Sequence, residues 1–222
     1  MLDIFEILGP VMVGPSSSHT AGAVRIGNMA RTLLGEPPVT AHIGLHGSFA
    51  ETGKGHGTDK ALIAGLLGMK PDDMDIPVSF QIAQAQGLSF DFREVQLRDA
   101  HPNSVVMELV GNAGHTLKMQ ASSTGGGRIM VNQLDNIPVE FTGDYHTLVI
   151  HNQDDCGYIA EVTTELSKMQ VNIANMRLCR HERGGEAIMV IETDQQVPPV
   201  AIQLLGELEG INKITYYERE DT

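Results

Sequence analysis

Apolar residues in the first part of the chain change between the spacing of strands and the spacing of helices. Ala41, Ile43 and Leu45 alternate with polar residues or glycine, which predicts a strand with one buried face. Residues 20–34 and 58–67 instead carry apolar side chains at helical spacing. Shorter elements are also expected: helices over 2–10 and 81–86, and strands over 89–97, 104–110 and 115–121.

Beyond Gly143 the pattern follows the order strand, helix, strand, strand, helix, strand. The first of these helices, over 157–169, has an apolar face made of Ile159, Val162, Leu166 and Met169. The βαββαβ order is that of the ferredoxin-like fold. Together with HNQDDCGYIA and VNIANM, this order resembles an ACT domain, a small regulatory module that often binds amino acids at a subunit interface. We therefore expect two domains, 1–142 and 146–222.

The charge and the composition exclude several classes of function. The 222 residues are 41% hydrophobic and carry a formal net charge of -13, so a sizeable core can form beneath an acidic surface. Such a surface repels phosphate backbones, so we expect no nucleic-acid partner. There is no apolar run of about 18 residues and no basic leader, so we expect no membrane contact and a cytoplasmic location.

Cysteines and histidines give little sign of a metal site in this chain. Cys156 and Cys179 are the only cysteines, and two thiols so far apart predict neither a disulfide framework nor a zinc knuckle. We expect both to be small buried apolar groups. His42 and His46 fall on one face of the predicted strand, which would suit zinc, but no close cysteine or carboxylate completes a ligand set.

The stretch GPSSSHTAG, residues 14–22, places three serines and a histidine before a predicted helix. Pro15 fixes a turn, and the unpaired N–H groups at a helix N-terminus attract an anion. The lysine of a phosphate-binding P-loop is absent, so a carboxylate suits this stretch at least as well as a phosphate. The alternative is that Ser18 simply caps the helix.

A second glycine-rich stretch, HGSFAETGKGHGTD, predicts a loop that carries Lys54 and His56 and leads into a helix at Thr58 or Asp59. Glycines let a backbone approach a ligand closely, and histidine accepts a proton near neutral pH. The alternative is a solvated loop in which the histidine has no function.

Two shorter motifs follow these stretches. HPN, residues 101–103, predicts a turn at the entry of a strand. STGGGR, residues 123–128, predicts either a nest of N–H groups or the tip of a hairpin. Neither motif indicates a function on its own.

The four motifs in this order, followed by the ACT-like segment, closely resemble one family: the β subunit of the two-chain bacterial iron–sulfur L-serine dehydratase. The resemblance implies an α+β fold whose N-terminal mixed α/β domain is similar to the allosteric-substrate-binding domain of D-3-phosphoglycerate dehydrogenase. It also implies a lyase that converts L-serine to pyruvate and ammonia. In this family, a [4Fe-4S] cluster bound by cysteines of the α subunit acts as a Lewis acid on the substrate hydroxyl.

The resemblance further implies roles for individual residues. His56 would be the base that takes the Cα proton, and His19 would hold the substrate carboxylate or assist. The other substrate-binding residues would be Ser16, Ser17, Ser18, Thr20, Lys54 and Asn103. A cluster with one open iron needs three thiolates, and this chain has two cysteines, so we expect an α-subunit partner to hold it.

The ACT-like segment is expected to self-associate, and Asn172 matches a position that holds the effector in serine-binding ACT domains. Asp154 stands where those domains have an asparagine, and its charge would repel a carboxylate. The segment is therefore predicted to bind L-serine weakly or not at all. The alternative to the enzyme is a stand-alone amino-acid-sensing module, in which the anion loops bind an effector without chemistry.

Overall fold

The structure is a computed structural model that describes residues 11–219, so the helix expected over 2–10 lies outside the described residues. The chain divides into two compact units, Met1–Asn132 and Gln133–Thr222. The expected domain limits at 142 and 146 stay predictions. In the described part of the chain, no helix combines the length and the apolar character that a membrane crossing requires.

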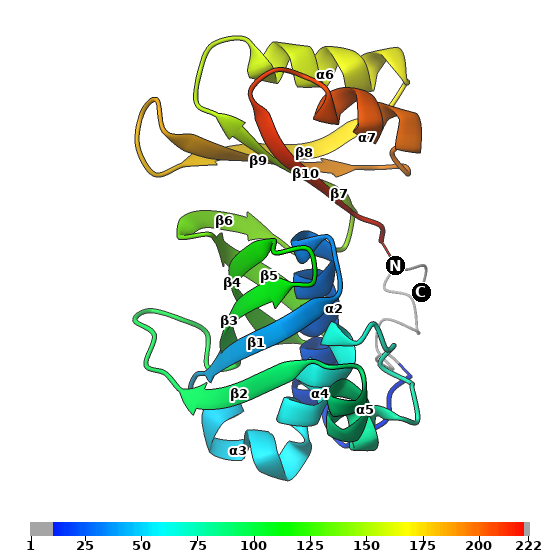
Figure 1. Cartoon of the computed structure of the whole chain (residues 1–222), viewed down its shortest axis with the longest axis vertical. Coiled ribbons are helices and arrows are strands. Elements are labelled where there is room, and N and C mark those ends of the chain that lie inside the picture. The colour runs from blue at the N-terminus through cyan, green and yellow to red at the C-terminus, as the bar shows by residue number, and fades with distance from the viewer. Residues whose placement is uncertain (1–10, 220–222) are drawn as a thin grey trace, which may run out of the picture. The chain divides into compact units, whose positions relative to one another are not determined.

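A six-stranded sheet with helices packed against it carries the four sequence motifs (Figure 1). The strand order is β2-β1-β3-β4-β5-β6, with β1 parallel to β2 and antiparallel to β3. The strands are β1 Pro38–Leu45, β2 Ser89–Glu94, β3 Ser104–Gly111, β4 Thr116–Gly125, β5 Arg128–Leu134 and β6 Ile137–Phe141. The helical segments are a π-helical turn Ser17–Ala21, α2 Gly22–Leu34, α3 Ser48–His56, α4 Thr58–Leu66, a 3-10 turn Ile76–Val78 and α5 Ser79–Ala85.

The alternation predicted for β1 is confirmed, since Ala41 and Ile43 are fully buried and His42 between them is exposed. Strands β5 and β6 were not predicted. The sequence signal for them was the Asp135-Asn136 pair in the turn that joins them. Both residues adopt positive φ there, at 46° and 69°. Aspartate and asparagine tolerate this left-handed conformation better than most residues, and such pairs close tight hairpins.

Helices α2 and α4 approach each other at two glycines. A Cβ built on Gly65 would lie 2.1 Å from the carbonyl oxygen of Val24, and one built on Gly27 would lie 2.4 Å from that of Leu62. These neighbours are backbone atoms, so they cannot rotate away. The close contact holds the second half of α4 against the first half of α2.

The loop predicted for Lys54 and His56 is wrong, because both residues belong to the helix α3. Glycines at 53 and 55 lower the intrinsic helix propensity of this segment. Tertiary packing overrides that preference: Phe49 is fully buried and anchors the helix. Gly57, with φ of 73°, ends α3 and starts α4, so the second predicted helix begins at Thr58 as expected.

The second unit confirms the βαββαβ prediction. Its sheet has the order β10-β7-β9-β8, and Figure 1 shows α6 and α7 on one face of that sheet. The elements are β7 His146–Gln153, α6 Tyr158–Lys168, β8 Ile173–Arg180, β9 Glu186–Thr193, α7 Pro199–Gly206 and β10 Ile211–Tyr217. Val162 and Leu166 of α6 lie in the core, with Met169 packed beside them.

Two expectations for the second unit are wrong. Ile159 was placed on the buried face of α6, but it is 46% exposed because it lies in the first turn, beyond the edge of the core. Cys156 was expected to be buried, yet it is exposed in the loop before α6. Cys179 is half-buried, since β8 is an edge strand, and burial raises the pKa of its thiol.

We predict that Gly65→Ala destabilises the chain by about 1–3 kcal/mol, the usual range for overpacking, although alanine favours helices. Gly206→Ala is the matched control, because its Cβ would lie 3.5 Å from Ile214 Cγ2, an ordinary contact. Urea unfolding of both variants measures the difference. A Gly65→Ala variant as stable as the Gly206→Ala variant would show that the helices do not depend on this contact.

Candidate active site

The stretch GPSSSHT forms a π-helical turn that leads into α2. Ser16 is its N-cap, and the Oγ of Ser16 accepts a hydrogen bond from the backbone N–H of His19 at 3.2 Å. The interpretation in which Ser18 caps the helix is therefore wrong, because the cap lies two residues earlier. Gly14 is required at the start of the turn, since a Cβ at its φ of 142° would lie 2.4 Å from Thr20 Oγ1.

His19 is 9% exposed and packs against α3. Its Nε2 lies 3.0 Å from Thr52 Oγ1 and 3.3 Å from Ser48 Oγ, while its Nδ1 lies 3.3 Å from Ser16 Oγ. The ring also meets Phe49 edge-on, with centroids 5.3 Å apart. Both nitrogens of this imidazole thus have hydroxyl partners inside the fold.

Ser48 and Thr52 were not predicted as site residues. The sequence reasoning placed them in a loop, where their spacing carries no meaning. On a helix, residues four apart lie on the same face, so their spacing was the signal that could have identified them. Their hydroxyls face a histidine that had already been predicted.

His56 is the last residue of α3, and its ring lies 5.0 Å from that of His19, at an interplanar angle of 78°. The two histidines predicted for catalysis are therefore neighbours. They differ in environment, because His19 is buried and His56 is exposed. Among the described residues, no hydrogen bond engages a ring nitrogen of His56. Of the two rings, His56 is the one that can meet a molecule from outside the chain.

Burial lowers the pKa of His19 below its ordinary value of 6.5, and the neighbouring His56 lowers it further. A hydrogen bond involving the Ser48 backbone acts in the opposite direction but does not outweigh them. His19 is therefore neutral at pH 7. The fold disfavours the charged form of His19. Its contribution to the free energy of unfolding is therefore fully present above pH 6.5 and declines as the pH falls below that value.

The HPN and STGGGR motifs lie beside the same turn. The N–H of Ser123 donates to the carbonyl oxygen of Asn103 at 3.0 Å, and a Cβ on Gly22 would lie 2.1 Å from Ser123 Oγ. The three glycines form the tip of the β4–β5 hairpin, and a Cβ on Gly125 would lie 4.0 Å from Ser18 Oγ. The structure thus brings together four motifs that are far apart in the sequence.

The remaining predicted residues occupy different parts of this region. Ser17 and Ser18 are partly exposed in the π-helical turn, whereas Thr20 is buried. Lys54 belongs to α3 by its backbone, and its side chain lies outside what the structure describes. Asn103 follows the exposed His101, whose Nδ1 accepts a hydrogen bond from the Asn103 N–H at 3.1 Å.

Buried side-chain oxygens without a hydrogen-bond partner gather in these motifs. They include Thr20 Oγ1, Thr58 Oγ1, Asn103 Oδ1 and Ser123 Oγ. Leaving such a group unpaired costs about 1–3 kcal/mol. Unsatisfied groups of this kind are rare in folded proteins and tend to mark functional positions or water sites. Their concentration in the four motifs sets this region apart from an ordinary packed core.

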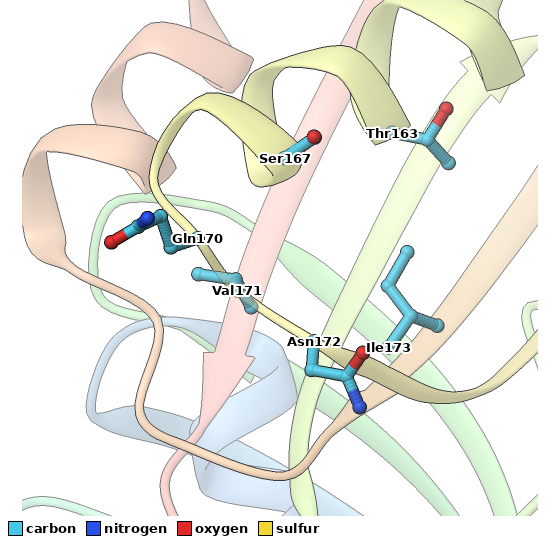
Figure 2. Close-up of a pocket in the computed structure, with 6 residues that line it drawn as sticks. All are labelled: Thr163, Ser167, Gln170, Val171, Asn172 and Ile173. Atoms are coloured by element: carbon cyan, nitrogen blue, oxygen red, sulfur yellow. The ribbon is translucent and has the colours of Figure 1, made fainter.

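Asn172, the predicted effector residue, lies in the second unit and not in this region. It lines an open pocket of about 410 Å³ between the end of α6 and the start of β8 (Figure 2). The other lining residues are Thr163, Ser167, Gln170, Val171 and Ile173. The side-chain amide of Asn172 donates a hydrogen bond to the carboxylate of Asp194.

The reason given for weak serine binding, repulsion by Asp154, does not hold. The N–H of Gly184 donates to the Asp154 carboxylate at 2.8 Å, and Arg180 forms an ion pair with it. These partners hold the pKa of Asp154 below its ordinary value, chiefly through the Gly184 hydrogen bond. Its side chain is 10% exposed, and its charge is compensated by these two groups of the β8–β9 hairpin. The acidic neighbour of Asn172 is Asp194.

Comparison with known proteins agrees with the geometry. Residues 1–134 match the family model "Serine dehydratase beta chain", and residues 146–210 match "ACT domain". The chain is 39% identical to a probable L-serine dehydratase, beta chain, from Bacillus subtilis, covering 96% of each protein. It is 37% identical to the L-serine dehydratase, beta chain, of Peptoniphilus asaccharolyticus, covering 95% of this chain and 94% of that protein.

A more distant similarity supports the predicted fold of the first segment. The chain is 26% identical to a D-3-phosphoglycerate dehydrogenase from Bacillus subtilis, over 85% of this chain and 36% of that enzyme. The predicted fold class, a mixed α/β domain followed by an ACT domain, is confirmed. The chain belongs to the serine dehydratase β-chain family.

Proposed function

We propose that this chain is the β subunit of an L-serine ammonia-lyase and supplies the proton-transfer and carboxylate-binding groups for the conversion of L-serine to pyruvate and ammonia. The observation that carries the proposal is the pairing of a buried, neutral His19 with an exposed His56 in a member of this family. Two imidazoles in contact but in different environments can perform different tasks in one reaction.

His56 takes the proton from Cα of L-serine, because its ring is exposed and its nitrogens are not engaged within the described fold. The electron pair of the broken C–H bond forms the Cα–Cβ double bond as the Cβ–O bond breaks, and the hydroxide that leaves takes up a proton to become water. The resulting aminoacrylate tautomerises to an imine, which water hydrolyses to pyruvate and ammonia. The mechanism requires close alignment of His56 with Cα, because that proton is only weakly acidic.

The substrate carboxylate is held at the π-helical turn, where Ser17 and Ser18 present partly exposed hydroxyls. His19, a buried residue of the same turn, assists through its contact with Ser16. Thr20, Lys54 and Asn103 complete the proposed substrate-binding set. In this arrangement the backbone N–H groups of the turn contribute a positive field toward the carboxylate.

The residues of this chain do not fit an iron–sulfur cluster. The sequence has two cysteines, and both belong to the second unit, whereas the paired histidines belong to the first. The described residues contain no group of three or more histidine, cysteine or acidic side chains able to hold a metal ion. We propose that a [4Fe-4S] cluster is bound by the cysteines of an α subunit. The exposed, free Cys156 suits the reducing conditions of a cytoplasmic location.

Gly55 marks a surface suited to that α subunit. It lies within the helix α3, one residue before His56, and a Cβ built on it would meet nothing within 4 Å in this chain. Glycine inside a helix costs about 1 kcal/mol relative to alanine, and no contact with the described residues requires it. Close approach of a partner beside the base would require it.

We predict that His56→Asn, assembled anaerobically with the α subunit, lowers kcat for pyruvate formation by roughly 10²–10⁴-fold, as expected for loss of a general base. His181→Gln is the control, since it replaces an exposed histidine in the β8–β9 turn. Size-exclusion chromatography verifies assembly. Near-normal turnover by an assembled His56→Asn complex would remove His56 from the role of base.

The second unit is proposed to regulate the enzyme through self-association and a small effector. Strand β8 lies at the edge of its sheet, so no strand among the described residues pairs with its outer side, and Ile159 is exposed on α6. The pocket at Asn172 lies between the end of α6 and this edge strand. Contact with a second copy along β8 would enclose that pocket, and we propose Asn172 as its effector-binding residue.

We predict that L-serine itself binds this pocket weakly, because Asp194 accepts the hydrogen bond of Asn172 and its charge opposes a carboxylate. Asp194→Asn should therefore increase the affinity of the full chain for L-serine in calorimetry. Asn172→Ala, in the Asp194→Asn background, serves as the matched control and should remove the gain. Submillimolar binding by the wild-type chain that Asn172→Ala abolishes would contradict the prediction.

A further inference from the structure

Three hydroxyl contacts around the ring of His19 decide where its ring proton lies. The hydroxyl of Thr52 donates to the carbonyl oxygen of Ser48 at 2.8 Å, one turn earlier in α3. A carbonyl oxygen only accepts, and a threonine hydroxyl has a single hydrogen. The shorter 2.8 Å contact favours the Ser48 carbonyl oxygen as the acceptor of that hydrogen, which leaves Thr52 Oγ1 to accept from its other neighbours.

The nearest of those neighbours is His19 Nε2, at 3.0 Å. Since Thr52 Oγ1 can only accept, Nε2 must carry a hydrogen, or two lone pairs would face each other. Ser48 Oγ, 3.4 Å from Thr52 Oγ1, can supply its own hydrogen to the second lone pair of that oxygen. Every donor and acceptor of the Thr52 hydroxyl then has a partner.

The other side of the ring is compatible with this assignment. Ser16 Oγ accepts from the backbone N–H of His19 at 3.2 Å, and its hydrogen remains free to point at Nδ1, 3.3 Å away. In a neutral imidazole one nitrogen donates and the other accepts. A hydrogen on Nε2 therefore leaves the lone pair on Nδ1, where the Ser16 hydroxyl can donate to it.

We propose that Thr52 is a positioning residue that fixes His19 as the neutral Nε2–H tautomer, with Nδ1 as its only basic atom. Resting on the proposed function, this gives the two histidines different tasks. His19 exchanges protons only at Nδ1, by way of Ser16, while His56 is free to act as the base. It also leaves Ser17 and Ser18, not Ser16, to donate hydroxyl hydrogens to a carboxylate.

The direct test is NMR of the ring nitrogens and ring N–H protons in the ¹⁵N-labelled full chain, well above the titration of His19. The His19→Gln spectrum assigns the signals. We expect a protected Nε2–H proton and an unprotonated Nδ1 in the wild type and in Thr52→Ser, which keeps the hydroxyl. In Thr52→Val, which keeps the shape without the oxygen, the proton signal should be lost to exchange and the two nitrogen shifts should converge.

A wild-type spectrum with an unprotonated Nε2, or a Thr52→Val spectrum identical to wild type at His19, would overturn the proposal. The same variants assembled with the α subunit provide the second readout. Thr52→Val should lower kcat by roughly 10–10²-fold, the effect of a misoriented catalytic group, while Thr52→Ser stays near wild type. If the NMR result holds but the assembled wild type makes no pyruvate, the proposed function fails and the tautomer assignment stands.

Discussion

The burial of one imidazole with a partner at each nitrogen is the constraint on which the rest of the first unit depends. His19 belongs to the π-helical turn and packs against α3, and its Nδ1 and Nε2 both meet hydroxyls. The turn packs against α3 and leads into α2, which contacts α4 closely at Gly27 and Gly65. Burial keeps the ring neutral, and this neutrality lets a second histidine stand beside it without charge repulsion.

The described residues of this chain supply only some of the groups that the proposed reaction needs. The chain holds the proposed base, a turn suited to an anion and buried oxygens without partners, yet no cluster of metal ligands within its described residues. Among the described residues, none covers the exposed His56 or fills the space beside Gly55. A partner that brings the Lewis acid would complete the site, which is the division of labour proposed for the two subunits.

The sequence predicted the parts of this molecule that have a strong period or a strong motif. The βαββαβ order, the β1 alternation and the pairing of two motif histidines could be read from apolar spacing and from resemblance. The helix around Lys54 and His56 could not, because Gly53 and Gly55 disfavour a helix and only the burial of Phe49 imposes one. Ser48 and Thr52 were missed for the same reason, and Asp154 was misjudged because its partner Arg180 comes from a distant strand.

The most direct test of the account is an anaerobic reconstitution that measures pyruvate formed from L-serine. The purified chain alone should be colourless and inactive, and it should gain activity only when mixed with an α subunit that carries an iron–sulfur cluster. Pyruvate formation by the iron-free chain on its own would contradict the central claim. So would a stable complex with a loaded α subunit that binds L-serine but never turns it over.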